Sequence, residues 1–379
     1  MQRPTTPHFP VESITSRGHS SSDSTQVEVV AKTSTESRST DRKNARKVFS
    51  QRTNSLLGIQ IIGSGSYVPD QVVTNEDLEA ERGFDPEWIS QRTGILERRH
   101  APDGQATSDL CIEAARRAIR SARVDPSEID LVLVGTFTPD YNCPSTACLV
   151  QDKLGLDAPA VDLQAACSGF IYGLMMGKAM IESGAMDNII IVTSEAYSKL
   201  IHPDDRATMT LFGDGAAATL LRSDSVGLGE FELGSDGGGM DKFIVPAGGS
   251  RTPKSLETAV QMTDTSGNIR SAENIYMDGA AVLRFVKREV PPNVTKLLEK
   301  TGYSYDDIDL FVFHQASGMS LDHLESTLKI PPKKMYRNLE RVGNTVSASI
   351  PIAIRDAQSE GLAMAIQQVE VTTQRKHIS

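Results

Sequence analysis

From residue 57 onward, short apolar runs alternate with longer segments in which apolar residues recur every three or four positions. The runs have the length and the β-branched content of buried strands, and the longer segments have the period of helices. Strands are expected at 59–62, 129–135, 160–163, 188–193, 216–221 and 308–313. Helices are expected at 110–122, 145–154, 168–184, 280–301, 320–328 and 346–359. Alternation of the two kinds of element predicts an α/β fold in which helices cover central sheets.

Two stretches of the chain lack this pattern. Residues 225–275 are rich in Gly, Ser and Thr, and we expect a long loop or cap region there. Residues 1–56 are rich in Ser and Thr and carry nine basic against five acidic side chains. Such a segment buries too little apolar surface to offset its ordering entropy, so we expect a disordered N-terminal extension. The alternative is a transit peptide for a plastid, but the acidic residues count against it.

The composition excludes several classes of protein. The net charge of −10 argues against a nucleic-acid binder, because phosphate backbones attract clusters of Lys and Arg. No apolar run approaches the roughly 18 residues of a membrane span, and the N-terminus lacks the apolar core of a secretory signal. The four cysteines are too irregularly spaced for a disulfide framework or a zinc site. We therefore expect a cytoplasmic protein without a metal.

The element Gly63-Ser-Gly65 follows the first expected strand and hints at a dinucleotide-binding turn. The third glycine of that fingerprint is missing, however, and Val68-Pro69 follows where a helix should begin. A nucleotide cofactor held in this way is therefore not expected.

Cys167 is the candidate nucleophile. It lies in Ala165-Ala-Cys-Ser-Gly-Phe170, between the end of an expected strand and the start of an expected helix. A thiol at a helix N-terminus meets the positive end of the helix dipole, which favours the reactive thiolate. The alternative is a buried structural cysteine at a tight turn. Cys111 differs, because it lies on the apolar face of an expected helix and is expected in the core.

Two further residues accompany this cysteine. His314 ends the apolar run Phe311-Val-Phe313, at the carboxyl tip of a strand where α/β proteins place their chemistry. Asn344 lies in a Gly343-Asn-Thr345 turn before the last expected helix. A thiolate with an imidazole and an amide can carry an acyl thioester and stabilise an oxyanion or enolate. Papain-like proteases also use Cys, His and Asn, but their Cys-Gly-x-Cys-Trp element is absent from this sequence.

Between about residues 58 and 358 the sequence resembles the β-ketoacyl-acyl-carrier-protein synthase III family. The motifs that carry the resemblance are Gly63-Ser-Gly-Ser-Tyr-Val-Pro69, Glu87-Trp-Ile-Ser-Gln-Arg-Thr-Gly-Ile95, Ala165-Ala-Cys-Ser-Gly-Phe170, Asp205-Arg206, Leu211-Phe-Gly-Asp-Gly215, His314-Gln-Ala316 and Gly343-Asn-Thr345. The resemblance implies a homodimer with a thiolase-like fold, in which two similar halves form five α/β layers. One half, 57–224, would supply Cys167, and the other, 276–379, would supply His314 and Asn344.

The resemblance also implies a reaction. An acyl-CoA primer would acylate Cys167 and release CoA, and a malonyl-acyl-carrier protein would then condense with it and lose carbon dioxide, as in the initiation of fatty-acid synthesis. His314 and Asn344 would stabilise the enolate formed on decarboxylation. No tightly bound cofactor is implied, because acyl-CoA is a substrate.

Three further residues match the family's CoA-binding positions. Trp88 and Arg206 correspond to the pair that stacks on the adenine, and Arg92 corresponds to a residue near the CoA phosphates. Core packing is the alternative for Trp88, the only tryptophan, but its polar neighbours favour a surface helix. Phe212 and Asp214 match structural positions that support the dimer and the sheet.

The sequence departs from the family in the helix that follows His314. That helix commonly carries basic residues that dock the carrier protein. Polar or apolar residues stand there instead, with two acidic neighbours: Met319, Ser326 and Thr327, and Asp322 and Glu325. Docking through other basic residues is possible, namely Lys287, Arg288 or Lys333-Lys334.

A second departure follows Ser359-Glu-Gly361. The family continues with two strands joined by a Gly-rich loop that donates a backbone N–H to the thioester oxygen. Residues 362–379 contain no glycine, so the second half is expected to be incomplete, less stable and catalytically weaker. Two alternative functions follow from these departures: a related acyl-condensing or acyltransferase enzyme of secondary metabolism, or an inactive paralogue of the same fold.

Overall fold

The structure is a computed structural model that describes residues 58–224, 227–235, 237–362 and 369–372. These residues all belong to one compact unit, Arg52–Ser379. The expected disordered extension or transit peptide at 1–56 therefore lies outside the described residues. So does most of the segment after Gly361, on which the expectation of an incomplete second half rests.

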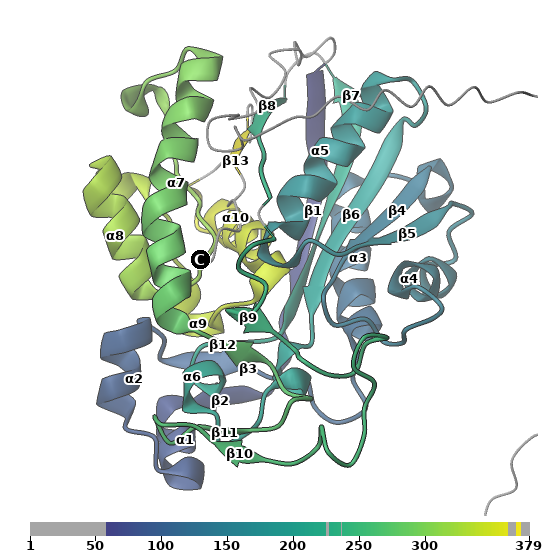
Figure 1. Cartoon of the computed structure of the whole chain (residues 1–379). Coiled ribbons are helices and arrows are strands. Elements are labelled where there is room, and N and C mark those ends of the chain that lie inside the picture. The colour runs from purple at the N-terminus through teal and green to yellow at the C-terminus, as the bar shows by residue number, and fades with distance from the viewer. Residues whose placement is uncertain (1–57, 225–226, 236, 363–368, 373–379) are drawn as a thin grey trace, which may run out of the picture. The chain divides into compact units, whose positions relative to one another are not determined.

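A mixed sheet of five strands forms the centre of the first half, in the order β1-β7-β6-β4-β5 (Figure 1). The strands are β1 (Gly58–Tyr67), β4 (Leu131–Gly135), β5 (Ala160–Leu163), β6 (Asn188–Glu195) and β7 (Gly215–Asp224). β4 is parallel to β5 and β6, whereas β7 is antiparallel to β1 and β6. The five strands expected between residues 59 and 221 are confirmed.

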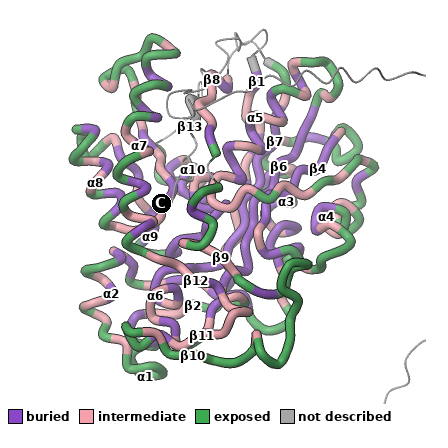
Figure 2. The backbone as a smooth tube through the Cα atoms, viewed as in Figure 1, coloured by how far each residue is buried: buried purple, intermediate pink, exposed green. Residues whose placement is uncertain are grey.

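Helices cover both faces of this sheet, as the continuous apolar runs require. α3 (Thr107–Ala122) and α4 (Thr146–Leu154) lie on one face, and α5 (Gly169–Glu182) and α10 (Ser349–Ser359) lie on the other. Along β4, Val132 and Val134 pack toward α3, while Leu131 and Leu133 pack toward α5. Figure 2 shows the central strands buried along most of their length.

The two glycines of Gly63-Ser-Gly65 lie inside β1 and do not form a loop after it. A Cβ atom on Gly63 would lie 2.6 Å from the carbonyl oxygen of Ala118, and one on Gly65 would lie 2.5 Å from that of Ala114. Both contacts are with α3. The glycines therefore allow this helix to pack closely on the strand, and the hint of a dinucleotide site is explained by packing.

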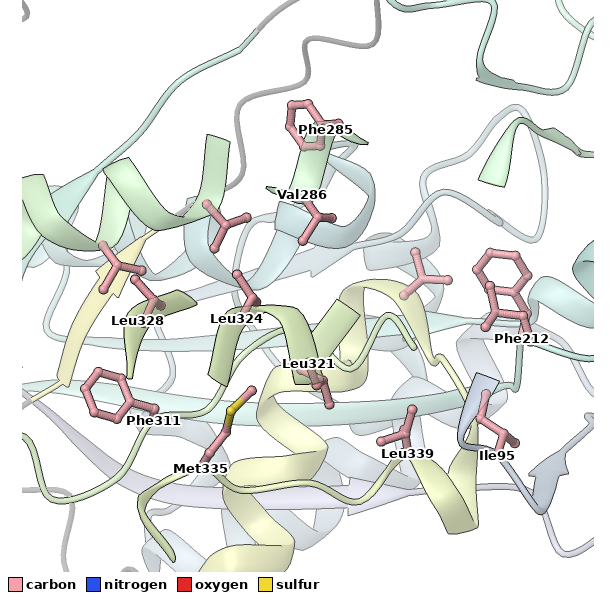
Figure 3. Close-up of a cluster of buried hydrophobic side chains, with 14 of the residues drawn as sticks. Ile95, Phe212, Phe285, Val286, Phe311, Leu321, Leu324, Leu328, Met335 and Leu339 are labelled. Carbon is pink, nitrogen blue, oxygen red and sulfur yellow. The ribbon is translucent and has the colours of Figure 1, made fainter. Parts of the chain in front are cut away.

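The second half is built around an apolar cluster between α7 (Gly279–Thr301), α8 (Gly318–Leu328) and α9 (Leu339–Val342). Figure 3 shows Leu321, Leu324 and Leu328 of α8 in this cluster, with Phe285 and Val286 of α7. Apolar residues at this spacing share one helix face, so the helical expectations for this region are confirmed.

The strand expected at 308–313 is not formed. Only Phe311 pairs, in an isolated parallel bridge with Met335. The alternating burial is nevertheless present, because Phe311 and Phe313 pack into the α7–α8 cluster while Leu310 and Val312 pack against α10. A continuous strand also needs a backbone ladder with a neighbour, and the described residues supply only this bridge.

The remaining elements are short. The expected loop region 225–275 contains β8 (Leu228–Glu232), β9 (Phe243–Ile244), β10 (Met262–Thr263) and β11 (Ile269–Arg270), and β8 pairs in parallel with β13 (Val369–Thr372). Elsewhere lie β2 (Val72–Thr74), α1 (Asn75–Arg82), α2 (Pro86–Thr93), β3 (Glu97–Arg99), α6 (Arg206–Met209) and β12 (Tyr276–Met277). None of the described helices combines the length and apolar character needed to span a bilayer.

Candidate active site

Cys167 lies in a tight turn between β5 and α5. The turn is the 3-10 helix Ala166–Ser168, and α5 begins at Gly169. Ala166 has a φ of 46°, in the left-handed region that residues other than glycine rarely adopt. Cys167 is partly buried and packs against the α7–α8 cluster. The strand-turn-helix placement expected from the sequence is confirmed, with the thiol two residues before the helix.

A turn of the same form occurs in the second half. The 3-10 helix Val346–Ala348 leads directly into α10, and Val346 has a φ of 51°. Ser347 therefore occupies the place in this turn that Cys167 occupies in the first. The two turns meet, because a Cβ atom on Gly169 would lie 3.4 Å from the Cβ of Ser347.

Asn344 precedes the second turn, and its amide is held in a fixed orientation. Its Oδ1 accepts a hydrogen bond from the N–H of Val346 at 2.9 Å, and its Nδ2 donates to the carbonyl oxygen of Ala316 at 3.3 Å. Its backbone pairs with the segment around Phe212. Among the described residues Nδ2 has no second acceptor, so one N–H of the amide is left for a further partner.

His314 is buried beside the start of α10. Its Nδ1 lies 2.6 Å from Oγ of Ser349, and the same Oγ accepts a hydrogen bond from the N–H of Gln315 at 3.2 Å. When this hydroxyl donates its proton to Nδ1, the neutral imidazole carries its own proton on Nε2. Burial lowers the pKa of His314 to about 4, which keeps the ring neutral at pH 7.

One short segment, residues 344–349, links the three candidate catalytic side chains. It contains Asn344, it bonds His314 through Ser349, and through Ser347 it packs beside Gly169, two residues after Cys167. The structure therefore brings together the three candidates from positions far apart in the sequence.

Sequence reasoning missed a buried carboxylate beneath this site. Glu195 ends β6 and is fully buried. It accepts hydrogen bonds from Oγ of Ser347 at 2.8 Å, from Oγ1 of Thr138 at 2.9 Å and from the N–H of Phe137 at 3.0 Å. Burial raises the pKa of Glu195 to about 7, against the opposing effect of these bonds. A charged residue at the end of an otherwise apolar strand was the signal available in the sequence.

The three candidate CoA-binding residues lie side by side. The guanidinium carbon of Arg206 is 4.5 Å from the centroid of the Trp88 ring, and that of Arg92 is 5.9 Å from it. Trp88 is half-buried on α2, which Asp85 caps at its N-terminus, so it is not a core residue. Within the described chain neither Arg92 nor Arg206 pairs with a carboxylate, which leaves both able to bind an anion.

The expected structural residues also lie where the sequence indicated. Cys111 is fully buried on α3, and burial raises the pKa of its thiol. Phe212 packs on Tyr197 with ring centroids 4.6 Å apart. Asp214 is buried and accepts hydrogen bonds from the N–H groups of Ala101 and Ser198.

Family models match both halves of the chain. Residues 161–237 match the model described as 3-oxoacyl-[acyl-carrier-protein (ACP)] synthase III, and residues 298–372 match its C-terminal counterpart. Cys167 lies in the first match, and His314 and Asn344 lie in the second.

Known proteins are similar over most of the chain. A β-ketoacyl-[acyl-carrier-protein] synthase III of Rhodopirellula baltica is 42% identical, over 81% of this chain and 92% of its own. The enzyme of the same name from Caldanaerobacter subterraneus is 42% identical, over 80% of this chain and 89% of its own length. A crystal structure of a 3-oxoacyl-(acyl-carrier-protein) synthase III superimposes with a TM-score of 0.76 at 38% identity, covering 80% of this chain and 92% of that one. The expected thiolase-like fold is thus confirmed.

Proposed function

The chain belongs to the β-ketoacyl-acyl-carrier-protein synthase III family, and on that premise we propose that Cys167, His314 and Asn344 carry out the condensation that initiates fatty-acid synthesis. The observation that carries the proposal is the segment 344–349, which joins the histidine and asparagine to the turn of the nucleophile. The protein is an acyltransferase of this family.

In the first half-reaction the thiolate of Cys167 attacks the carbonyl carbon of an acyl-CoA. The bond to the CoA sulfur breaks, CoA leaves as a thiol after taking up a proton, and the acyl group stays on Cys167 as a thioester. The position of Cys167 before α5 supports this role, because the dipole of that helix stabilises the thiolate.

In the second half-reaction a malonyl thioester loses carbon dioxide and leaves an enolate. The Nε2–H of His314 and the free N–H of Asn344 donate hydrogen bonds to its oxygen. The enolate carbon then attacks the acyl thioester, the Cys167 thiolate leaves, and a 3-oxoacyl-carrier protein is formed. A neutral imidazole with its proton on Nε2 fits this role, because Nε2–H is then the donor of the ring while Nδ1 accepts from Ser349.

The direct test of the function uses the purified full-length protein with a panel of acyl-CoAs. We expect a mass increase equal to one acyl group on Cys167, and a 3-oxoacyl-carrier protein after malonyl-carrier protein is added. A protein that neither acquires an acyl group nor forms this product would disprove the proposal.

The adenine of CoA is proposed to stack at Trp88 and Arg206, where an indole and a guanidinium already face each other. We expect Trp88→Ala to raise KM for acyl-CoA with little change in kcat, because the adenine binds equally in the ground and transition states. Stacking of a base on an aromatic side chain is worth about 1–3 kcal/mol, which corresponds to a roughly 5- to 150-fold change in KM. The measurement is steady-state kinetics with acyl-CoA as the varied substrate.

The matched control is Tyr303→Ala, which removes an aromatic side chain that is 37% exposed after α7. Its KM should stay at the wild-type value. A fall in kcat at constant KM in Trp88→Ala would assign Trp88 a structural role instead.

Carrier-protein docking is proposed on the exposed side of α7 and α8. The acidic residues of α8 are partly compensated, because the single guanidinium of Arg337 lies 2.5 Å from Asp322 and 2.8 Å from Glu325. One positive charge between two carboxylates leaves a net negative charge, so the negative charge expected on this helix is reduced but not removed. On neighbouring α7, Arg284 and Lys287 are exposed.

The other basic candidates are partly engaged. Arg288 pairs with Glu289 at 2.7 Å, and Nζ of Lys334 donates to the carbonyl oxygens of Asp306 and Ile308. Lys333 is also exposed but stands next to the engaged Lys334, whereas Arg284 and Lys287 lie three residues apart on one face of α7 and are proposed to attract an acidic carrier. His314 lies only four residues before the start of α8, so the proposed docking surface on α7 and α8 lies near the proposed active site.

We expect Lys287→Glu to raise KM for malonyl-carrier protein severalfold and to leave KM for acyl-CoA unchanged. The effect should shrink at high ionic strength, because charge steering is screened by salt. Arg120→Glu, which reverses an exposed charge on α3, is the control. Equal effects of the two variants would place carrier docking elsewhere.

A homodimer in the cytoplasm completes the proposal. β5 is an edge strand with Val161 44% exposed, and an apolar edge of this kind favours pairing with a second chain. All four cysteines lie in the described part of the chain and none of them forms a disulfide, which suits a reducing compartment.

A further inference from the structure

A short hydrogen bond crosses from the sheet of the first half to the turn Val346–Ala348, which lies between Asn344 and the Ser349 that contacts His314. Its acceptor is Glu195 at the end of β6, and its donor is Oγ of Ser347, at 2.8 Å. Ser347 has only one alternative acceptor in the described chain, the carbonyl oxygen of Gly135 at 3.4 Å, so its proton points to Glu195. The bond therefore joins a buried carboxylate of one half to the other half.

The remaining contacts of Glu195 all come from its own half. Thr138 donates through its hydroxyl and Phe137 through its backbone N–H, while Thr136 lies farther away at 3.4 Å. With the bond from Ser347, two hydroxyls and one N–H donate to the carboxyl group, and no described cation pairs with it. The bonds from its own half fix the orientation of Glu195 before it meets Ser347.

The turn that Ser347 anchors is strained. Val346 has a φ of 51°, and for a β-branched residue this conformation is a genuine outlier that costs on the order of 1–3 kcal/mol. Such a conformation persists only where surrounding contacts hold it. Two contacts do so here: the N–H of Val346 donates to Asn344, and Ser347 donates to Glu195.

We propose that Glu195 is a positioning residue, whose carboxylate holds the segment 344–349 against the half that carries Cys167. The segment contains Asn344, and its Ser349 bonds Nδ1 of His314. Loss of the bond would therefore let both enolate-binding groups move relative to the thioester, while the thiol keeps its own turn. The inference rests on the roles proposed above for Cys167, His314 and Asn344.

The test separates the two half-reactions in Ser347→Ala. Acylation of Cys167 should stay within about threefold of wild type, and malonyl decarboxylation should fall about tenfold, since one buried hydrogen bond is lost. Glu195→Gln should produce a smaller split in the same direction, because the amide oxygen of Gln can still accept the proton of Ser347. The double variant should be no worse than Ser347→Ala, because both changes act on one interaction.

The control is Ser108→Ala, which removes a hydroxyl bond of 2.7 Å to a carboxylate, Asp140, within the half of the nucleophile. We expect Ser108→Ala to lower the melting temperature about as much as Ser347→Ala does. The rates of both half-reactions should stay at the wild-type values. Equal loss of acylation and decarboxylation in Ser347→Ala, or no loss in either, would overturn the proposal. An unmutated protein that fails to acylate Cys167 would instead disprove the proposed function, so the two failures are distinguishable.

Discussion

Replacement of Cys167 by alanine is expected to abolish formation of the acyl-enzyme, and with it the whole condensation. The thioester intermediate needs a sulfur at the turn before α5, and the other three thiols lie elsewhere. Cys111 lies on the buried face of α3, and burial raises the pKa of its thiol, so the thiol stays protonated and unreactive. The measurement is intact-protein mass after incubation with acyl-CoA, followed by peptide mapping.

The matched control is Cys148→Ala, because Cys148 is an exposed thiol on α4 in the same half. This variant should acquire the acyl group at the wild-type rate. Acylation that persists undiminished in Cys167→Ala would remove Cys167 from the mechanism.

The second large effect is expected from His314→Ala and Asn344→Ala. Each variant should lose about 10²–10³-fold in malonyl decarboxylation, the usual cost of one oxyanion donor in a preorganised site. Acyl transfer to Cys167 should be largely retained, because the thiolate attacks the acyl-CoA before any enolate is formed. Release of carbon dioxide from a labelled malonyl thioester measures one step, and the mass of the acyl-enzyme measures the other.

Asn188→Ala is the control for loss of a buried amide. Asn188 begins β6, at the opposite end of the strand from Glu195, and donates to the carbonyl oxygen of Glu128. It should lower stability and leave the ratio of the two half-reactions at the wild-type value. If His314→Ala and Asn344→Ala reduced both half-reactions equally, the division of roles between thiol and enolate-binding groups would be wrong.

The sequence by itself determined the first half of the molecule. Strands such as 188–193 are apolar throughout, and helix 110–122 repeats its apolar residues with the helical period, so each element is specified by nearby residues. The candidate nucleophile was also visible locally, because Cys167 stands at a junction of strand and helix. His314 and Asn344 were identified by their positions at a strand tip and a turn, and by the resemblance.

The strand expected at 308–313 marks a limit of such reasoning. The alternation of side chains between two buried faces depends on neighbouring residues alone, and it is present in the structure. Pairing depends on a neighbouring strand from elsewhere in the chain, and within the described residues Phe311 has only its bridge to Met335.

Only the tertiary structure decided how the site is assembled. The bond from Ser347 to Glu195 joins residues 152 positions apart, and the pair Ser349–His314 spans 35. The pairing of Arg337 with Asp322 and Glu325, and the contact of Arg206 with Trp88, are equally invisible to periodicity. Periodicity reports which face of an element is buried, whereas the partner of a buried polar group depends on which distant segment is packed against it.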